Sequence, residues 1–169
     1  MESDSTRGSM TPESIPWQWG EDAHERDRDV ILNAAGGARF TLSRNPAGTV
    51  TGIKRINAGE QEAWFTAVST PFANTASLLV KGGRLYVALY SDIATGCEVM
   101  ALDTESGKLL WRTRLQGLGP LHHSKYQNRV QLRFLDTWLV VFGDEAAGKY
   151  IEVLEPKHGG TISNRVVKP

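Results

Sequence analysis

The feature that most constrains this chain is a strand–turn–strand unit between Val99 and Leu115, which reads VMALDTESGKLLWRTRL. Alternating apolar residues on both sides of its polar centre indicate two β-strands, because successive side chains of a strand point to opposite faces. Gly107 falls where a hairpin turn needs positive φ, and the Asp103 carboxylate can accept hydrogen bonds from the turn amides. Trp111 follows four residues later. The unit predicts a hairpin whose second strand presents an indole to a neighbouring sheet.

Two further copies of this unit give the chain an internal period of about 46 to 54 residues. Each copy has two aliphatic residues and a polar residue ahead of a turn glycine: Ile53, Ile56, Asn57 and Gly59; Val99, Leu102, Asp103 and Gly107; Ile151, Leu154, Glu155 and Gly159. The preceding strand also repeats, as RFTLS, LYVALY and LVVFG. In the place of Trp111 the first copy has Trp64, one residue late, and the third has Ser163.

The period-2 alternation divides the second and third copies into four strands each. The predicted strands are 76–81, 84–91, 98–103 and 109–115, then 127–135, 138–144, 150–155 and 161–167. No segment has a sustained helical period. We therefore predict an all-β chain of antiparallel four-stranded meanders, with a repeat domain at 38–169 and blades at 38–70, 74–116 and 126–168.

The segment ALDTESGKLLW resembles the repeat of pyrroloquinoline-quinone-type (PQQ-like) β-propeller blades, whose usual form is ALD-x-x-TGK-x-x-W. The resemblance extends over residues 38–167, with a specific motif at 99–111 and a degenerate one at 151–160. It implies a partial, β-propeller-like fold of two to three blades. Propellers of this repeat type include quinone-dependent dehydrogenases, which hold the cofactor with calcium over a closed ring, and outer-membrane assembly scaffolds of bacteria.

The resemblance also assigns structural roles to individual residues. Asp103, Gly107 and Gly159 belong to the turns of the repeat, whereas Trp64 and Trp111 pack between neighbouring blades. An indole buries roughly 150–250 Å², which makes packing a sufficient reason for both tryptophans. Neither is therefore predicted to be a ligand-binding residue.

Three blades leave two open sheet faces, because closed propellers have about four to eight blades. Three arrangements stay open: two chains that close a ring, docking on a larger partner, and a compact sandwich or barrel without a central channel. The segment IPWQW at 15–19 is expected to cap an end or to add a strand to the last blade. We assign residues 15–37 to a docking or capping segment and 1–14 to a disordered tail. A further possibility is that the chain is a piece of a longer propeller.

Charge and hydropathy exclude two classes of protein. Nineteen basic and nineteen acidic residues give a formal net charge of zero, so the chain lacks the basic surface of a nucleic-acid binder. No apolar run is long enough for an integral membrane segment. The first residues, MESDSTRGSMTPES, have no apolar core of a secretory signal. The chain as written is therefore predicted to be cytoplasmic, or periplasmic if its N-terminus is processed.

Few residues are candidates for chemistry. His122 and His123 would point to opposite faces of a strand, which favours a polar loop over a metal site. The single cysteine, Cys97, is predicted to be a small buried residue. No cluster of carboxylates supplies the six to eight oxygen ligands that calcium prefers. We predict no catalytic residue, no metal and no cofactor.

The predicted function is a non-enzymatic protein-interaction scaffold that binds a protein partner or self-associates. Trp17 and Trp19 are the candidate partner contacts, because they lie outside the repeats and share one face of an extended segment. The alternative is a small-molecule binding protein or truncated quinoprotein-type enzyme with its ligand at an oligomeric ring axis. That alternative predicts bound calcium or quinone, with polar side chains converging on strands 76–81 and 127–135.

Overall fold

The computed structural model describes residues 11–18, 20, 30–73, 75–91, 95–119, 129–145 and 148–167. Within these ranges the chain forms three four-stranded antiparallel sheets and two short 3-10 turns. The fold class is therefore all-β, as predicted. In every sheet each strand pairs with its neighbour in sequence, so each sheet is a meander.

The strands follow one another in three groups of four. Sheet 1 consists of β1 (Ile31–Asn33), β2 (Arg39–Arg44), β3 (Val50–Ile56) and β4 (Glu62–Thr70). Sheet 2 consists of β5 (Thr75–Lys81), β6 (Arg84–Ser91), β7 (Gly96–Asp103) and β8 (Leu109–Arg114). Sheet 3 consists of β9 (Val130–Leu135), β10 (Trp138–Glu145), β11 (Gly148–Leu154) and β12 (Thr161–Val167).

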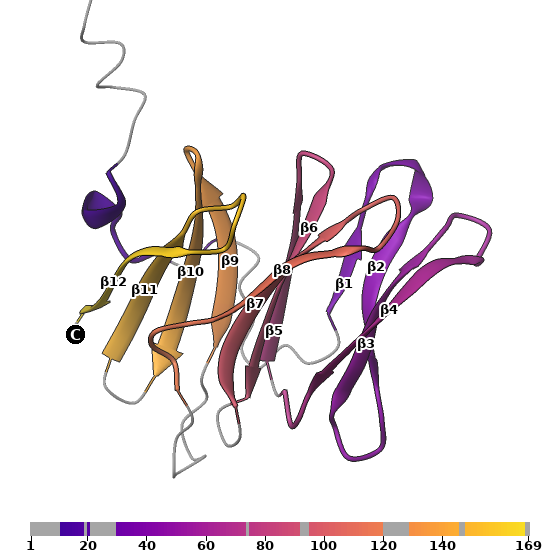
Figure 1. Ribbon diagram of the computed structural model, residues 1–169, viewed down its shortest axis with the longest axis horizontal. Coiled ribbons are helices and arrows are strands. Elements are labelled where there is room, and N and C mark those ends of the chain that lie inside the picture. The colour runs from indigo at the N-terminus through magenta and orange to yellow at the C-terminus, as the bar shows by residue number, and fades with distance from the viewer. Residues whose placement is uncertain are drawn as a thin grey trace, which may run out of the picture.

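The three sheets stand side by side in chain order, with sheet 2 in the middle (Figure 1). The first strand of sheet 2, β5, contacts the first strands of both neighbours, β1 and β9. The last strands, β4, β8 and β12, form the opposite edge of each sheet. This is the radial arrangement of propeller blades, in an open arc of three.

Two-residue turns explain why the hairpins of sheets 2 and 3 are short. Gly82 and Gly83 have φ values of 61° and 76°, and Lys81 pairs with Arg84 across the turn. Asp136 has a φ of 57° in the corresponding turn of sheet 3. Positive φ in such turns matches the right-handed twist of the strands, which is why glycine and aspartate occur here.

Two elements differ from the predicted boundaries. β1 lies within the segment 15–37, so sheet 1 begins at Ile31 and not at residue 38. Pro12–Ser14 form a 3-10 turn inside the stretch expected to be a disordered tail; residues 1–10 lie outside the described ones. A three-residue strand and a single turn have too few residues to show a period, so pattern reading misses both.

Two of the three buried apolar clusters lie on sheet 2, one on each of its faces. Along β6, Leu85, Val87 and Leu89 face sheet 1, whereas Tyr86, Ala88 and Tyr90 face sheet 3. All six are buried, because neighbouring sheets cover both faces of the strand. An unbroken apolar run such as LYVALY is what a strand covered on both faces requires. Each large side chain contributes roughly 1.5–3 kcal/mol of burial free energy.

Candidate functional site

Trp64 of β4 joins sheet 1 to sheet 2. Its indole lies against Gly107, where an added Cβ would come within 2.4 Å of the ring. The indole Nε1 donates a hydrogen bond of 2.9 Å to the carbonyl oxygen of Thr104. The hydroxyl of Thr66 donates a second bond, to the carbonyl oxygen of Gly107. Gly107 also has a φ of 76°, so both backbone conformation and contact require glycine here.

Trp111 of β8 forms the same joint between sheets 2 and 3. A Cβ added at Gly159 would lie 2.4 Å from the indole. Nε1 donates a bond of 2.8 Å to the carbonyl oxygen of Pro156, and the Thr113 hydroxyl donates one of 2.8 Å to that of Gly159. We term these two contacts the indole joints. The threonine two residues after each tryptophan was not predicted, although the shared Trp-x-Thr spacing could have identified it.

The turn that accepts Trp64 is held by its own side chains. The carboxylate of Asp103 accepts bonds from the amide of Ser106 at 3.1 Å and from its hydroxyl at 2.8 Å. These bonds lower the pKa of Asp103. Arg55 reaches over from sheet 1 and donates a bond of 2.8 Å to the carbonyl oxygen of Thr104. The first indole joint therefore docks on a preformed turn.

Glu152 of β11 anchors the connection that leaves sheet 2, and sequence reasoning did not single it out. Its buried carboxylate accepts bonds of 2.9 Å from the amide of Gln116 and 3.3 Å from that of Gly117. The hydroxyls of Tyr150, at 2.6 Å, and Thr161, at 2.5 Å, donate to the same group. These donors satisfy a charge that would otherwise be costly to bury. A glutamate inside the apolar run YIEVL was the available signal.

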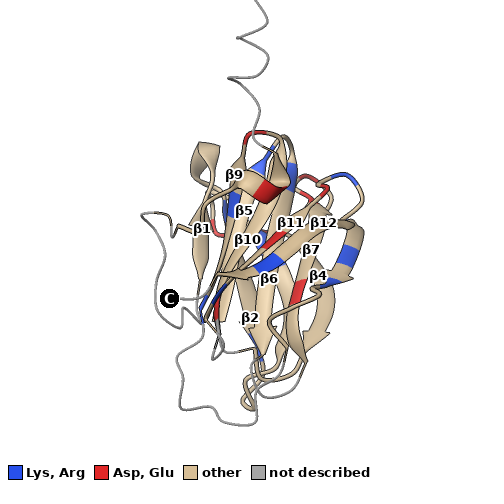
Figure 2. Cartoon of the chain, turned by 90° about the vertical axis from the view of Figure 1, so that its left-hand side faces the viewer, with Lys and Arg blue, Asp and Glu red and all other residues tan. Residues whose placement is uncertain are grey.

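The face of sheet 3 that points away from sheet 2, here termed the trailing face, is apolar. It presents Val140, Phe142, Ile151 and Val153. Ile15 is fully buried against them, and Trp17 packs at the margin of the same cluster. We term residues 11–18 with Gly20 the N-terminal strap. Figure 2 views the molecule from this side.

At the other end of the three sheets, the face of sheet 1 that points away from sheet 2, here termed the leading face, is largely polar. The pairing of the strands shows which residues of this face correspond to apolar residues of sheet 2, because Arg39 pairs with Ile56 as Leu85 pairs with Leu102. By the same register Thr41 and Ser43 replace Val87 and Leu89, and Lys54 replaces Met100. Phe65 and Ile31 are the exposed apolar residues among them. The leading face therefore lacks the apolar layer that two sheets of this chain bury between them.

The turn between β3 and β4 of sheet 1 also has a charged residue where the corresponding turns of the other two sheets have a glycine. Glu60, with a φ of 65°, takes the backbone position of Gly107 and Gly159. The alignment of the repeats had placed Gly59 in this role. Glu60 and Arg39 form a two-bond ion pair with both distances 2.8 Å, and the guanidinium lowers the pKa of the Glu60 carboxyl. A side chain now stands where an indole would lie, so this turn does not offer a tryptophan site.

The remaining sequence candidates do not come together into a site. Cys97 is buried, and burial raises the pKa of its thiol well above the usual value, with the Glu152 and Glu98 charges adding to the effect. Trp19, His122 and His123 lie outside the described residues. Within the described ranges, His, Cys, Asp and Glu form no group of three that could hold a metal ion. No described helix is long and apolar enough to cross a bilayer.

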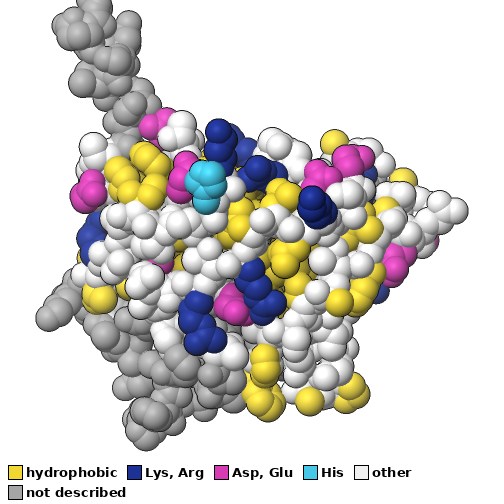
Figure 3. All heavy atoms as spheres, viewed as in Figure 1, with side chains coloured by type: hydrophobic (Ala, Val, Ile, Leu, Met, Phe, Trp, Pro, Cys, Tyr) yellow, Lys and Arg dark blue, Asp and Glu magenta, His cyan; other side chains and the backbone are white. Residues whose placement is uncertain are grey.

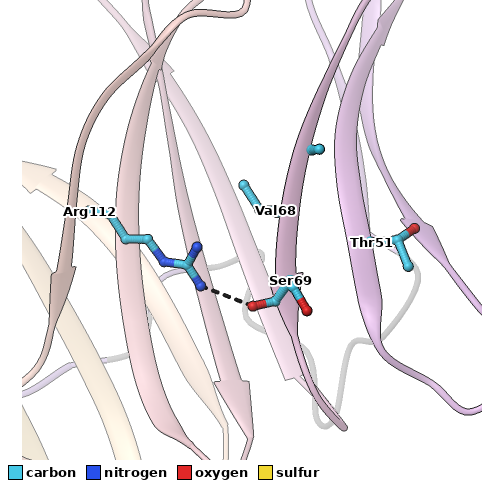
Figure 4. A pocket seen from close by; sticks show the side chains of 5 residues that line it. Thr51, Val68, Ser69 and Arg112 are labelled. Carbon is cyan, nitrogen blue, oxygen red and sulfur yellow. Dashed lines mark hydrogen bonds between the residues drawn. The ribbon is translucent and has the colours of Figure 1, made fainter.

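A shallow cleft of about 410 Å³ lies between sheets 1 and 2, lined by Thr51, Ala67, Val68, Ser69 and Arg112 (Figure 4). Arg112 donates a bond of 3.0 Å to the carbonyl oxygen of Ser69 and pairs with Glu98 at 2.7 Å. Its charge therefore ties the two sheets together within the cleft.

Polar residues of the innermost strands β5 and β9 serve neighbouring segments. The hydroxyl of Ser77 accepts a bond of 3.0 Å from the amide of Leu132, which links the two strands. Gln131 accepts one of 2.6 Å from the amide of Gly20, and Arg133 donates one of 3.1 Å to the carbonyl oxygen of Gln18. These groups hold the strap and the sheets; residues 127–128 of the predicted inner cluster lie outside the described ones.

Comparison with known proteins shows similarity of fold. No protein-family model and no curated protein sequence matches the chain. BamB from Moraxella catarrhalis is similar with a TM-score of 0.53 and 17% identity, covering 92% of this chain and 41% of BamB. A quinohemoprotein alcohol dehydrogenase from Comamonas testosteroni is similar with a TM-score of 0.50 and 12% identity, covering 89% of this chain and 22% of the enzyme. The chain thus spans less than half of either protein, and the similarities support a PQQ-like propeller fold.

Proposed function

We propose that this chain is a non-enzymatic protein-interaction scaffold built from PQQ-like propeller blades. The observation that carries the proposal is the pair of indole joints, in which Trp64 and Trp111 dock on turns of the following sheet. These joints hold side chains of different sheets at fixed spacings. A rigid, preorganised surface loses little conformational freedom when a partner binds, which favours association.

The surface offers apolar anchors of the kind that interfaces use. Exposed large apolar side chains occur on or beside all three sheets: Ile31, Phe65, Phe72, Val80, Leu109, Leu110, Ile162 and Val166. Several apolar side chains reach the surface in the middle of the view in Figure 3. Charged side chains of both signs lie among them (Figure 3), which is consistent with a mixed interface and with the zero net charge. The analogy with scaffold propellers of this repeat type works at the level of fold.

The alternative function places a small ligand at the axis of an oligomeric ring. Such a ring needs one sheet 3 to dock on the sheet 1 of another copy. The indole joint cannot be reused there, because Ser163 stands in the place of a tryptophan and Glu60 in that of a glycine. The geometry therefore favours the scaffold over the ring-axis binding protein.

Solution mass by light scattering after size exclusion separates the two functions first. The scaffold function predicts that the mass of the purified protein does not correspond to a closed ring of two or three copies. A stable ring of two or three chains, together with calcium or a quinone released on denaturation, would replace the scaffold by the ring-axis alternative.

Affinity capture with matched baits then tests for partners. Phe65→Asp on sheet 1 and Ile162→Asp on sheet 3 each change one exposed side chain and leave the core intact. A specific scaffold predicts that a protein captured by wild type is lost with one variant and retained with the other. Capture that is insensitive to both, or no capture combined with turnover of a substrate, would contradict the proposal.

A further inference from the structure

The strap occupies the trailing face as a peptide ligand occupies a groove. Ile15 inserts into the cluster of Val140, Phe142, Ile151 and Val153 with no exposed surface. Register places Val140 and Phe142 in the positions of Tyr86 and Ala88, whose face of sheet 2 is covered by sheet 3. The strap thus fills the place that a following sheet would take.

Most polar contacts of the strap go to its main chain. Arg165 donates a bond of 3.2 Å to the carbonyl oxygen of Glu13 and another to that of Ile15. Arg133 donates to the carbonyl oxygen of Gln18, and Gln131 accepts from the amide of Gly20. Main-chain groups are the same in every peptide. These contacts can therefore hold extended segments of different sequence.

Two side chains of the strap supply sequence preference. Ile15 fills the apolar cluster, and its φ of −66° and ψ of 120° give the extended conformation that a following proline imposes. Trp17 donates a bond of 3.3 Å to the carbonyl oxygen of Gly143, and its ring meets Phe142 edge-on at 6.3 Å. The ammonium group of Lys149 lies 4.9 Å from the indole centroid. The face thus contacts an aliphatic and an aromatic residue, and the exposed proline between them presets the extended conformation.

The strap is not part of the sheet that it covers. Among the described residues, sheet 3 consists of β9 to β12, and residues 15–18 belong to no strand. When the strap leaves the trailing face, no hydrogen bond between strands is broken. Departure of the strap therefore exposes the apolar cluster while the sheet keeps its main-chain hydrogen bonds.

We propose that the trailing face is a binding site for an extended peptide segment of a partner protein with an aliphatic–proline–aromatic core, and that the strap is its internal occupant. The proposal rests on the scaffold function and specifies where one partner binds. In this arrangement the partner's own aromatic residue takes the place of Trp17 on the face, so Trp17 is not itself the partner contact. Because a tethered occupant has an effective concentration in the millimolar range, a free peptide competes poorly with the strap in the intact chain.

The test uses the full chain and a fluorescent peptide with the sequence of residues 11–20, TPESIPWQWG, as probe. Ile15→Asp releases the strap, and Gln18→Ala, which changes an exposed side chain and keeps the main chain, is the matched control. Fluorescence anisotropy should show binding to Ile15→Asp about tenfold tighter, or more, than to wild type or Gln18→Ala. A probe peptide with aspartate in place of its isoleucine should not bind. Equal affinity of the probe for all three proteins would overturn the proposal.

Circular dichroism establishes that Ile15→Asp retains its sheets. If it does not, Trp17→Ala loosens the strap more mildly, and the same gain in probe affinity is required of it. Adding Arg165→Ala to the released variant should weaken probe binding, because two donors to peptide carbonyls are lost. Unchanged affinity would overturn the assigned binding mode.

The occupant can also be distinguished from a second copy of this chain. A wild-type dimer that disappears in Ile15→Asp would identify exchanged straps and overturn the proposal of a foreign partner. The scaffold function is tested separately, because probe binding concerns the trailing face alone. Probe binding without any captured partner would count against the scaffold function and leave the site, whereas capture without probe binding would do the reverse.

Discussion

The two ends of the arc solve the same problem in different ways. The trailing face of sheet 3 is apolar and is covered by the strap, with Ile15 fully buried on it. The leading face of sheet 1 has no such cover among the described residues. It carries Arg39, Thr41 and Lys54 at positions that are apolar in sheet 2. One end is closed by packing and the other by composition.

The difference shows that the repeat departs from its regular pattern at the two end sheets, where an uncovered apolar face would be unfavourable. An apolar face without a neighbour promotes aggregation, so an end sheet needs either a cover or polar residues. The strap provides the first solution because it is available in the same chain. The ion pair of Arg39 with Glu60 belongs to the second. The most sensitive tests therefore compare a position in a joint or beneath the strap with its counterpart on the leading face.

The largest effect is expected at the turn glycines. Gly107→Ala places a Cβ 2.4 Å from the Trp64 indole at a φ of 76°, so it should lower the free energy of unfolding by about 3 kcal/mol or more. Gly59→Ala, in the turn of sheet 1 with nothing within 4 Å, should change it by less than about 0.5 kcal/mol. Urea titration measures both. Similar losses for the two variants would show that the indole joint does not distinguish the turns.

The next effect concerns isoleucines at the two ends. Ile15→Ala should cost about 2–4 kcal/mol, because it leaves a cavity beneath the strap. Ile31→Ala on the leading face, where the side chain is 58% exposed, should cost less than about 0.5 kcal/mol. Thermal unfolding followed by circular dichroism compares them. A neutral Ile15→Ala would mean that the strap contributes nothing to stability.

A smaller difference is expected between equivalent positions of β8 and β12. Trp111→Phe keeps most of the apolar area and loses the bond to the carbonyl oxygen of Pro156, for a cost of about 1–2 kcal/mol. Ser163→Ala removes a buried hydroxyl that has no hydrogen-bond partner among the described residues, so it should be neutral or stabilising. Denaturant midpoints decide the comparison. A destabilising Ser163→Ala would reveal a role for that hydroxyl.

The smallest effect is the pH dependence of the Arg39–Glu60 ion pair. Arg39 lowers the pKa of Glu60 in the folded state, so the pair stabilises the fold above the unfolded-state pKa. That contribution is lost as the pH falls through the folded-state pKa. Glu60→Gln should therefore lower the melting temperature slightly at neutral pH, and the difference from wild type should vanish in strongly acidic solution. A difference that persists in acid would assign the effect to the left-handed backbone and not to the ion pair.

Local sequence patterns were sufficient for most of the sheets. Gly82-Gly83 and Asp136 mark turns, and the alternation between them defines strands that agree closely with the structure. The indole positions followed from repetition of the unit around Gly107. These features are encoded within a few residues of one another.

The end structures could not be predicted in the same way, because they depend on contacts between distant residues. Ile15 meets Val153 across most of the chain, and no local pattern distinguishes a strap from a loose tail. Glu60 occupies the left-handed position only because the first turn is shorter than the others. Glu152 is explained by amides of a connection that precedes its strand by many residues.

Each indole joint uses a tryptophan of one sheet and a turn glycine of the next. The row of sheets therefore has a direction, because its two ends carry different halves of the joint. Sheet 2 carries both the glycine that receives Trp64 and the Trp111 that is given to sheet 3. Sheet 3 receives and does not give, because it has Ser163, and sheet 1 gives and does not receive, because it has Glu60. Ser163 in sheet 3 and Glu60 in sheet 1 therefore prevent a further indole joint at either end, and their positions set how many sheets are joined in this way.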